Sequence, residues 1–360
     1  MTTLDSFITL GRSGLRVSPY CLGTMTFGED HGWGASVADS EAMLSAYLDR
    51  GGNFIDTANV YTNGHSETII GDYLAARPGL RDRLVLATKF FANLHPGDPN
   101  GGGTGRKALL DQLQHSLRRL QTDYIDIYWI HNWDRRTPVE ETLRTLDDLV
   151  RAGTIRYVGF SDLPAWVAAQ SQTLTQLRGW SPAIAFQLEY SLLERTSEGE
   201  LIPMAQALGM GVMPWSPLHN GHLTGKYRRG EAGDGGGRGH LVPGPSPADF
   251  DVIETLERVA AEAQTTMAAA ALAWVRAQPG VASTLIGART MAQLDANLGS
   301  LKVELSPEQL QTLTAASHPE LNFPASNHAT LSPLLAFGGM TVDGIAHRPS
   351  PLMATAATRY

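Results

Sequence analysis

Short apolar segments alternate with longer amphipathic segments along this chain, and the alternation repeats eight times. The apolar segments end in polar or turn residues, a pattern that predicts buried strands, and the amphipathic segments have the apolar spacing of helices. The expected strands span 19–23, 53–56, 84–88, 124–130, 157–160, 184–187, 212–214 and 282–286. The expected helices span 40–50, 67–76, 106–120, 139–152, 165–177, 201–208, 250–278 and 291–299. Eight strands, each followed by a helix, close a (β/α)8 or TIM barrel of the α/β class.

The length and composition are compatible with one such barrel. The chain has 360 residues, of which 42% are apolar and 18% charged, as in ordinary soluble globular proteins. The length alone would also allow two domains. The eight repeats favour a single domain over 1–360, with the barrel core at about 18–301. The opening segment FITLGRSGLRV contains a glycine turn between two short runs, and it predicts a hairpin that covers the amino-terminal end of the barrel.

Other segments do not fit the repeat. The segments 91–105 and 218–247 are long and rich in glycine, and they follow the third and seventh expected strands, where they would overhang the carboxyl ends of the strands. The segment 250–278 is expected to break near Thr265 and Thr266. A short helix is expected at 307–316, and the tail from about 317 to 360 has no barrel period.

Four polar residues follow the ends of three consecutive expected strands. They are Asp56 at the end of the second strand, Tyr61 in the loop after it, Lys89 directly after the third strand and His131 directly after the fourth. Each has an ordinary structural explanation when taken alone, such as a helix cap or a hydrogen-bonded core histidine. Active sites of parallel α/β barrels form at the carboxyl edge of the strands, and all four are expected at that edge. Their convergence therefore predicts an active site.

The charge and cysteine content exclude several classes of function. A net charge of −8, with a pI near 5.8 and no cluster of basic residues, argues against nucleic-acid and anionic-membrane partners. The single cysteine, Cys21, excludes an internal disulfide and is expected to be a buried, inert thiol. The amino end lacks a signal-peptide pattern and no segment approaches the length of a membrane span, so we expect a cytoplasmic protein.

One motif resembles a dinucleotide fingerprint but lacks its context. Gly103, Gly105 and Ala108 fit the pattern G-x-G-x-x-A at the start of a helix. In a Rossmann fold this turn follows the strand directly, so that the helix amino terminus faces a pyrophosphate. Here a long loop intervenes, and we interpret the glycines as loop residues.

The four residues suit the reduction of a carbonyl group. No cluster with metal-ligand spacing is present, so a side chain must supply the proton that the carbonyl oxygen takes up. Tyr61 suits this role if the neighbouring cation Lys89 brings its pKa closer to neutrality. Asp56 would hold the Lys89 ammonium by an ion pair, and His131 would donate a hydrogen bond to the substrate oxygen.

Several motifs resemble the signature segments of the aldo-keto reductase superfamily. NFIDTANVY, ATKF, IHNWD, GFSD, FQLEYSLL, MPWSPL and LIGAR occur in the same order, from about residue 7 to about residue 301. The branch that they resemble includes aryl-alcohol dehydrogenases and ion-channel β subunits. The resemblance implies an NADP-dependent reductase of aldehydes and ketones (EC 1.1.1.-), with Asp56, Tyr61, Lys89 and His131 in the catalytic roles given above.

The resemblance also implies a site for NADP(H). Ser161, Asp162 and Gln187 would hold the nicotinamide carboxamide, and Trp215 would stack on the ring; Asp162 replaces the more usual asparagine. Thr290 and Gln293 also fit a capping box, so Gln293 could instead cap its own helix. The full set of expected cofactor contacts is Thr24, Met25, Asp56, Ser161, Asp162, Gln187, Trp215, Ser216, Pro217, Leu218, Gly221, Leu223, Gly225, Lys226, Ile286, Gly287, Ala288, Arg289, Gln293 and Asn297.

Arg289 bears on the choice of cofactor. It lies beside the amino terminus of an expected helix, a natural position for binding a 2′-phosphate, which favours NADPH over NADH. Many relatives have a lysine where this chain has Gly287.

Aromatic residues in the same loops predict an apolar pocket for aryl or medium-sized aliphatic aldehydes and ketones. The expected substrate contacts are Phe27, Trp33, Tyr61, Phe90, Phe91, His131, Asn132 and Trp133. In similar reductases the carboxyl-terminal tail often folds over this pocket, although a disordered or subunit-contacting tail is equally compatible. The partner is expected to be a small carbonyl compound or alcohol, and the protein a monomer or a homo-oligomer.

Two other functions share parts of this pattern. Lys89 at a strand end could be the Schiff-base nucleophile of a barrel aldolase. Channel β subunits retain NADP and act mainly as regulatory or redox-sensing partners, and their four residues resemble these. Turnover of a carbonyl substrate with oxidation of NADPH distinguishes a reductase from both.

Overall fold

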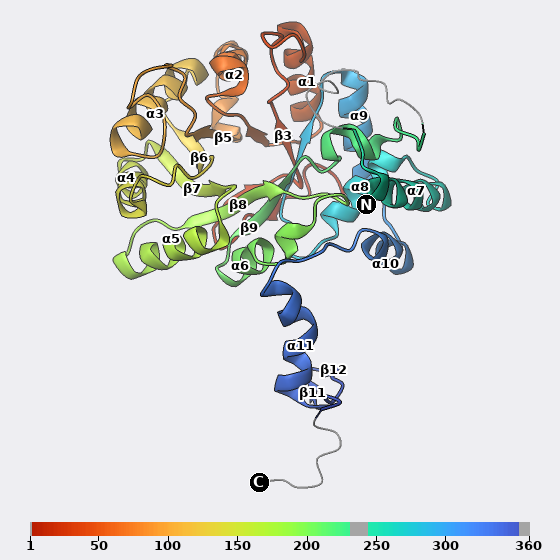
Figure 1. The fold of residues 1–360 in the computed structure, drawn as a ribbon. Coiled ribbons are helices and arrows are strands. Elements are labelled where there is room, and N and C mark those ends of the chain that lie inside the picture. Colours follow the sequence, from red (N-terminus) through yellow and green to blue (C-terminus); the bar gives the residue numbers. More distant parts are fainter. Residues whose placement is uncertain (1, 231–243, 353–360) are drawn as a thin grey trace.

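The computed structural model describes residues 2–230 and 244–352 (Figure 1). Eight parallel strands form one sheet in the order β10-β3-β4-β5-β6-β7-β8-β9. The strands of the chain are β1 Ile8–Thr9, β2 Arg16–Val17, β3 Tyr20–Gly23, β4 Phe54–Asp56, β5 Val85–Phe90, β6 Ile125–Ile130, β7 Ile155–Ser161, β8 Ala183–Glu189, β9 Gly211–Trp215, β10 Thr284–Gly287, β11 Thr341–Val342 and β12 Ile345–Ala346.

Helices connect the strands of the sheet and cover its outer face (Figure 1). The α-helices are α1 Val37–Asp49, α2 His65–Ala75, α3 Arg106–Leu120, α4 Val139–Ala152, α5 Ala165–Arg178, α6 Leu201–Ala207, α7 Pro247–Glu262, α8 Met267–Arg276, α9 Met291–Gly299, α10 Pro307–Ala316 and α11 Ala325–Phe337. The 3-10 helices are η1 Tyr61–Gly64, η2 Arg81–Arg83, η3 Thr196–Glu198, η4 His219–Thr224 and η6 Ser300–Lys302.

The sheet curls into a nearly closed barrel. Strand β10 pairs with β3, and β9 approaches the start of β10 through a parallel bridge between Val212 and Val281. The predicted TIM barrel is therefore confirmed, and each of the eight expected strands overlaps an observed one. The expected helix 250–278 is two helices, α7 and α8, and Thr266 caps the second by accepting a hydrogen bond from the Ala269 backbone N–H.

The barrel has two apolar layers. The larger layer lies between the strands and the surrounding helices. The smaller layer fills the inside of the barrel with residues such as Phe54, Ile127 and Trp129. Trp129 on β6 is paired with Gly159 on β7, and a Cβ added at Gly159 would lie 2.2 Å from the Trp129 ring. A glycine is therefore required beside this tryptophan.

The amino-terminal hairpin covers the amino-terminal end of the barrel, as predicted. Strands β1 and β2 pair antiparallel, and Leu10 and Val17 join the inner apolar layer. Arg12 donates its backbone N–H to the Gly209 oxygen, just before β9, at 2.8 Å. Gly11 has φ +56°, and a Cβ there would lie 2.0 Å from the Ile184 oxygen at the start of β8. The barrel is thus plugged at this end, which leaves the opposite end for a site.

The loop 91–105 is folded against the outside of the barrel. At its base the Gly103 backbone N–H donates to the Phe91 oxygen at 2.7 Å. Nearer its tip, the His95 ring lies 5.7 Å from the His115 ring on α3. The tip therefore lies over α3, outside the ring of strands, and does not overhang the strand ends as expected. Of the other predicted loop, 218–247, the part 231–243 lies outside the described residues.

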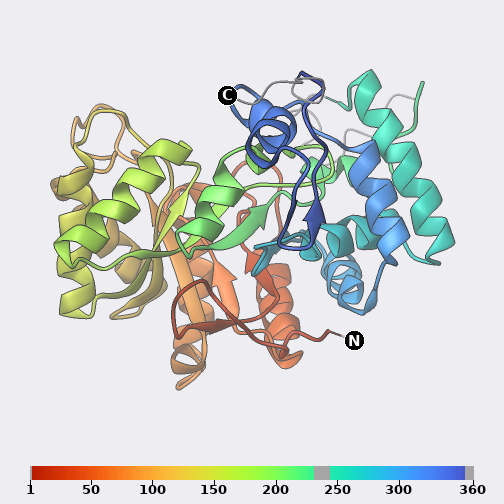
Figure 2. The same cartoon turned by 90° about the horizontal axis from the view of Figure 1, so that it is seen from below.

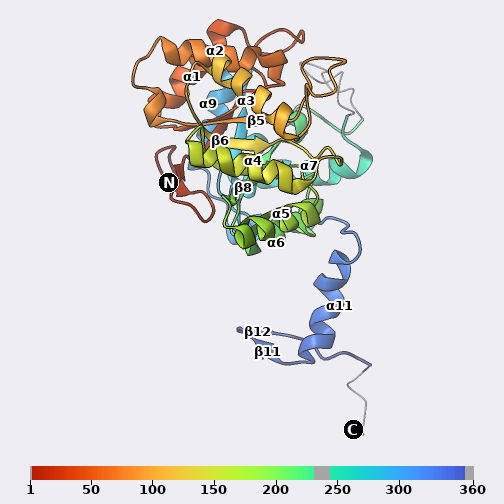
Figure 3. The same ribbon diagram turned by 90° about the vertical axis from the view of Figure 1, so that its left-hand side faces the viewer.

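The carboxyl-terminal segment is in two parts. Helix α10 packs beside α7, as Figures 1 and 2 show, and its Leu313 is fully buried. Helix α11 and the β11–β12 hairpin extend away from the barrel (Figures 1 and 3). The expectation that the tail folds over the substrate pocket is therefore not met by residues 325–346.

Candidate active site

Four polar side chains meet at the carboxyl ends of β4, β5 and β6. Asp56 is the last residue of β4, Lys89 lies near the end of β5, and His131 directly follows β6. Tyr61 begins η1, in the loop after β4. Neighbouring parallel strands end at one edge, so the barrel brings together residues that are far apart in the chain.

Lys89 is the centre of this group. Its ammonium forms an ion pair with Asp56 and donates to the Thr57 backbone oxygen at 2.9 Å and to the Tyr61 hydroxyl at 3.0 Å. The side chains of Lys89 and Asp56 are fully buried, and each of the three ammonium protons has an acceptor. Burial lowers the pKa of Lys89, but Asp56 and Tyr61 raise it more, so the pKa lies above its usual value. Lys89 is therefore a fixed cation.

Tyr61 remains protonated in this environment. Burial raises the pKa of its hydroxyl, and the Lys89 charge, which lowers the pKa, only partly offsets this. The Lys89 charge thus acts in the predicted direction, but it does not bring the pKa of Tyr61 below its usual value. The physical reason is that removal of the phenolate from water outweighs its attraction to the ammonium. Tyr61 is a proton donor with a cation 3.0 Å from its oxygen.

His131 lies edge-on to Tyr61, with ring centroids 6.1 Å apart and the rings at 83°. Burial, together with the Lys89 charge, lowers the pKa of His131 to about 3. The imidazole is therefore neutral near neutral pH and carries one N–H that it can donate. A carbonyl oxygen that reaches both rings could accept hydrogen bonds from Tyr61 and from His131.

Beside this group lies a second set of polar side chains, at the ends of β7, β8 and β9. The Ser161 hydroxyl is buried and has no hydrogen-bond partner within residues 2–230 and 244–352. Asp162 accepts a hydrogen bond from the Trp215 indole N–H at 3.1 Å. Gln187 donates its amide N–H to the free oxygen of Asp56 at 3.2 Å. Buried hydroxyls are rarely left unpaired, and beyond the neighbouring Asp162 the Ser161 hydroxyl is available for a further polar contact at this rim.

Asp162 has an unusual environment. Its backbone lies in the left-handed region, with φ 50°, and the residue is exposed at the rim although other groups surround its carboxyl. Reduced solvation of this carboxyl raises the pKa of Asp162 to about 6, although the Trp215 hydrogen bond and the Lys89 charge oppose the increase. The carboxyl group therefore titrates just below neutral pH.

The segment after β9 forms a series of tight turns. The Ser216 hydroxyl accepts from the Asn220 backbone N–H at 3.1 Å, and Gly221 and Gly225 have φ +93° and +89°. Pro217 and Leu218 lie between Ser216 and η4, and Lys226 is exposed after it. These turns present backbone groups beside Trp215, where the cofactor phosphates are predicted.

A separate turn links β10 to α9. The Gln293 side chain accepts from the Arg289 backbone N–H at 2.8 Å, and Asn297 donates to the Gly287 oxygen at 3.0 Å. The Thr290 side chain caps α9 by accepting from the Gln293 backbone N–H, which is half of the predicted capping box. The Gln293 side chain does not complete the box, because it accepts from Arg289 and not from Thr290. The Arg289 guanidinium forms no hydrogen bond or ion pair with another described residue. It is free to bind an anion at the start of α9.

Some predicted cofactor contacts have side chains in the interior. Thr24, Leu223, Ile286 and Ala288 are almost completely buried, and Thr24 donates its hydroxyl to the Asp56 backbone oxygen at 3.0 Å. These residues can face a cofactor only through their backbone. Met25, in contrast, is 40% exposed at the rim.

The comparison with known proteins agrees with this geometry. The family model described as "Aldo/keto reductase family" matches residues 19–318. The chain belongs to the aldo/keto reductase family. The matched range contains the whole barrel, both sets of polar side chains and α10.

Curated relatives in this family extend over most of the chain. A putative aryl-alcohol dehydrogenase of Saccharomyces cerevisiae is 36% identical over 327 residues, covering 87% of each chain. An NADP(+) aryl-alcohol dehydrogenase of Phanerodontia chrysosporium is 34% identical, covering 86% of this chain and 85% of its own. A norsolorinic acid reductase of Emericella nidulans is 36% identical, covering 87% of this chain and 81% of its own. The chain is therefore an oxidoreductase of the aldo/keto reductase family.

The aromatic residues of this aldo/keto reductase divide into two groups. Phe27 and Phe90 are fully buried in the outer apolar layer, and Phe90 packs on Tyr128 with centroids 4.7 Å apart. They are packing residues, which corrects the prediction that they contact substrate. Of the other six predicted contacts, Tyr61 and His131 belong to the group around Lys89, and four are partly or fully exposed in the rim loops: Trp33, Phe91, Asn132 and Trp133.

Two features of the rim were missed from the sequence. Trp166, on α5, stacks edge-on against Trp133 with centroids 5.2 Å apart and is 60% exposed. Glu189, at the end of β8, lies 3.8 Å from the His219 ring nitrogen, and burial and nearby carboxylates raise its pKa to about 7. The helical position of Trp166 and the strand-end position of Glu189 were signals that could have identified them.

The predictions for Cys21 and for metals can also be compared with the structure. Cys21 is buried inside the barrel, and burial raises the pKa of its thiol well above the usual value, so it is inert as predicted. Among the described residues no group of three or more His, Cys, Asp or Glu side chains could hold a metal ion. The same residues include no helix that is long and apolar enough to cross a bilayer.

Proposed function

We propose that this protein is an NADP(H)-dependent reductase that interconverts aryl or medium-sized aliphatic aldehydes and ketones with their alcohols. The observation that carries the proposal is the Lys89-Tyr61 hydrogen bond of 3.0 Å beside the neutral His131. The names of the relatives, which include aryl-alcohol dehydrogenases and norsolorinic acid reductases, support the same reaction.

NADPH, when bound, supplies the hydride that reduces the carbonyl carbon. Tyr61 gives its hydroxyl proton to the carbonyl oxygen, which would otherwise become an alkoxide. Lys89 stabilises the tyrosinate that remains, because its ammonium is held 3.0 Å away by Asp56 and the Thr57 oxygen. His131 donates a hydrogen bond to the same oxygen and orients it. In the oxidation of an alcohol the proton returns to Tyr61.

Three parts of the chain would hold the cofactor. Ser161, with its unpartnered hydroxyl, would bind the carboxamide together with Asp162 and Gln187. The turns at 216–226 would face the pyrophosphate, and Trp215 would stack on the nicotinamide ring. Arg289 would bind the 2′-phosphate, which is the basis for preferring NADPH over NADH.

The environment of Lys89 argues against the aldolase alternative. A Schiff base needs a neutral amine, whereas Asp56 and Tyr61 raise the pKa of Lys89 and all of its protons are engaged. The regulatory alternative shares the cofactor site and is separated by turnover. We propose a cytoplasmic location, and the protein as a monomer or homo-oligomer.

The test is an activity screen with 4-nitrobenzaldehyde and a panel of ketones, in which the oxidation of NADPH is measured. Stoichiometric oxidation of NADPH and formation of alcohol is the expected result. Cofactor binding without turnover of any of these carbonyls would favour the regulatory function. Trapping of a substrate on Lys89 by borohydride, without NADPH oxidation, would instead support the aldolase.

The preference for NADPH is tested by Arg289→Ala. Loss of a charged hydrogen bond to phosphate is worth about 1.5–3 kcal/mol, so the affinity for NADPH should fall by about tenfold to a hundredfold. The affinity for NADH, which lacks the 2′-phosphate, is the internal control and should change little. Equal losses for the two cofactors would remove Arg289 from the proposed role.

A further inference from the structure

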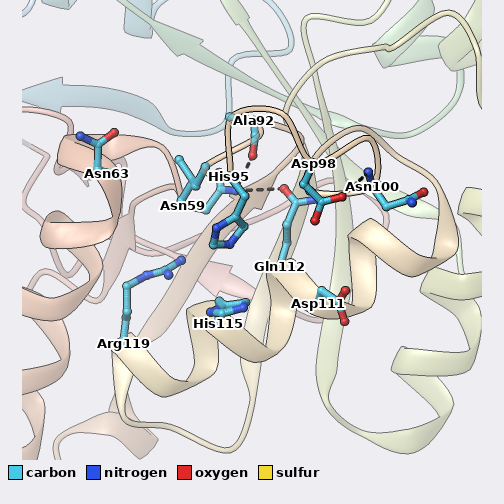
Figure 4. A pocket seen from close by; sticks show the side chains of 12 residues that line it. Asn59, Asn63, Ala92, His95, Asp98, Asn100, Asp111, Gln112, His115 and Arg119 are labelled. Carbon is cyan, nitrogen blue, oxygen red and sulfur yellow. Dashed lines mark hydrogen bonds between the residues drawn. The ribbon is translucent and has the colours of Figure 1, made fainter.

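A pocket of about 400 Å3 lies on the flank of the barrel, under the loop 91–105 (Figure 4). Its walls come from the loop that carries Asn59, from η1 and from the exposed side of α3. None of the four residues of the candidate active site lines it. A ligand there would not compete with the proposed reaction, so the inference below is independent of that reaction.

Two buried polar atoms on this pocket lack partners. Asn59 is 1% exposed and donates its amide N–H groups to Gln112 at 2.9 Å and to the Ala92 oxygen at 3.2 Å. Its carbonyl oxygen has no hydrogen-bond partner in the described part of the chain. Arg119 donates Nε to Glu67 at 2.7 Å, while its Nη2 is buried and equally without a partner among those residues. The pocket thus offers one unmet acceptor and one unmet donor.

Most charged groups around the pocket are paired, and the exception is a carboxylate: Asp98 accepts from the Asn100 backbone N–H at 2.8 Å but forms no ion pair with another described residue. The Arg119 guanidinium is paired with the buried Glu67, and Asp111 is paired with Lys107 at 2.9 Å. Burial and the charges of Arg118 and Arg119 lower the pKa of His115, which favours the neutral ring at neutral pH. No unpaired cation among these groups would attract an anion. A neutral ligand therefore fits better than a phosphate or a carboxylate.

The lining of the pocket is also polar. Ala92 and Leu94 are its apolar side chains, and amides, imidazoles and carboxylates make up most of the rest. A hydroxyl group both donates and accepts, so the hydroxyls of one ligand offer a donor for the Asn59 oxygen and an acceptor for the Arg119 Nη2. The volume lies at the lower end of the range for small-molecule sites. We propose that this pocket is a second ligand site and that it takes a neutral polyhydroxylated molecule of the size of a sugar or cyclitol.

The test is a titration of the full-length protein with D-glucose and with myo-inositol, observed through the ring signals of the protein's histidines by NMR. His95 and His115 both line the pocket, so their signals report on its occupation. We expect a saturable shift of these signals with at least one of the two polyols. Cyclohexanol, which has the same ring as inositol but one hydroxyl, is the matched probe and should produce none.

Two neighbouring arginines provide a matched pair of variants. Arg119→Lys keeps a charge for Glu67 but removes Nη2, and the loss of one hydrogen bond should weaken binding by about tenfold. Arg118→Lys changes a side chain that contacts His115 at 2.9 Å but does not line the pocket, so it should bind as the wild type does when the titration is observed through His95. If Arg119→Lys does not fold, His95→Ala on the exposed loop is used as the pocket variant in its place. Its titration is observed through the His115 signal, and polyol binding should again weaken by about tenfold.

Three outcomes would overturn the proposal. The first is that neither polyol produces a saturable shift, which would make the pocket a site for water only. The second is that inorganic phosphate, but neither polyol, shifts the signals of His95 and His115. The third is that the polyol binds equally well to wild type, to Arg118→Lys and to both pocket variants.

Discussion

The surroundings of each residue in the candidate active site limit that residue to one chemical role. Lys89 is saturated by Asp56, Thr57 and Tyr61, so it can act as a fixed charge but not as a nucleophile. His131 is neutral because burial lowers its pKa to about 3. Tyr61 is the remaining group with a proton to give, since its own pKa is raised.

Removal of the Tyr61 hydroxyl should therefore abolish most of the activity. Tyr61→Phe keeps the ring that packs against His131, so NADPH binding should change little. The rate constant kcat for 4-nitrobenzaldehyde should fall by about two orders of magnitude or more, the usual contribution of a general acid. Steady-state kinetics and a cofactor titration measure the two effects. Tyr157→Phe, on β7, is the control and should keep wild-type turnover.

Asp162 should make cofactor binding depend on pH. Its carboxylate can accept a charge-assisted hydrogen bond from the carboxamide, and this bond is lost as the group is protonated below its pKa of about 6. The Kd for NADP+ should therefore increase as the pH falls from about 7 to about 5, with Asp162 contributing on the order of tenfold. Fluorescence titration measures the Kd.

Asp162→Asn separates this effect from that of the cofactor itself. The 2′-phosphate also titrates near pH 6, so it contributes to the pH dependence of wild type and variant alike. The difference between the two proteins is the contribution of Asp162. Identical pH profiles would show that the Asp162 carboxylate makes no such bond.

At the scale of elements, the residues at paired positions of neighbouring strands determine how large the side chains inside the barrel can be. Trp129 on β6 occupies the space in which a side chain of β7 would lie, and Gly159 leaves that space open. The hairpin β1–β2 closes the amino-terminal end with Leu10 and Val17. Apolar side chains therefore fill the inside of the barrel at its amino-terminal end, and the polar side chains of the site lie at its carboxyl-terminal end.

Gly159→Ala should destabilise the barrel. The added methyl group would lie 2.2 Å from the Trp129 ring, and overpacking of this kind costs about 1–3 kcal/mol. Urea denaturation followed by tryptophan fluorescence measures the free energy of unfolding. Gly14→Ala is the matched control, because no heavy atom lies within 4 Å of a Cβ at that position. Equal stability of the two variants would mean that the inner layer tolerates the extra volume.

At the scale of the whole molecule, the carboxyl-terminal segment divides into a packed and a projecting part. The α10 helix is held by the buried Leu313, and Arg195 donates to the Thr314 oxygen at 2.6 Å. Helix α11 carries exposed Leu331 and Leu335 and extends from the barrel (Figure 3). Stability should therefore depend on the first part and not on the second.

Two truncations test this division. Removal of residues 325–360 should change the free energy of unfolding by less than about 1 kcal/mol, because little described surface of α11 is buried. Removal of residues 305–360 also deletes α10 and its Leu313, and should cost at least about 2 kcal/mol. Thermal denaturation of both proteins measures the difference. A large loss in the shorter truncation would show that the tail stabilises the barrel.

Much of this molecule could be predicted from local sequence patterns. The eight βα repeats, the hairpin and the break before α8 all follow from the spacing of apolar residues and from turn residues, which act over a few positions. The positions of Asp56, Tyr61, Lys89 and His131 at one edge followed from the same repeats. The burial of Phe27 and Phe90 could not be predicted, because a loop or strand-end aromatic can point to either side of a sheet.

The sequence by itself determined the barrel, the edge at which the site lies and the residues that meet there, since strand direction and order decide these. Only the tertiary structure decided how those residues behave. It reduced the solvation of the Tyr61 hydroxyl enough that the Lys89 charge does not lower its pKa below the usual value, and it surrounded Lys89 with three acceptors. It also left the Ser161 hydroxyl and the Asn59 oxygen without described partners. Desolvation and hydrogen bonding depend on distances between distant segments, and those distances exist only in the folded chain.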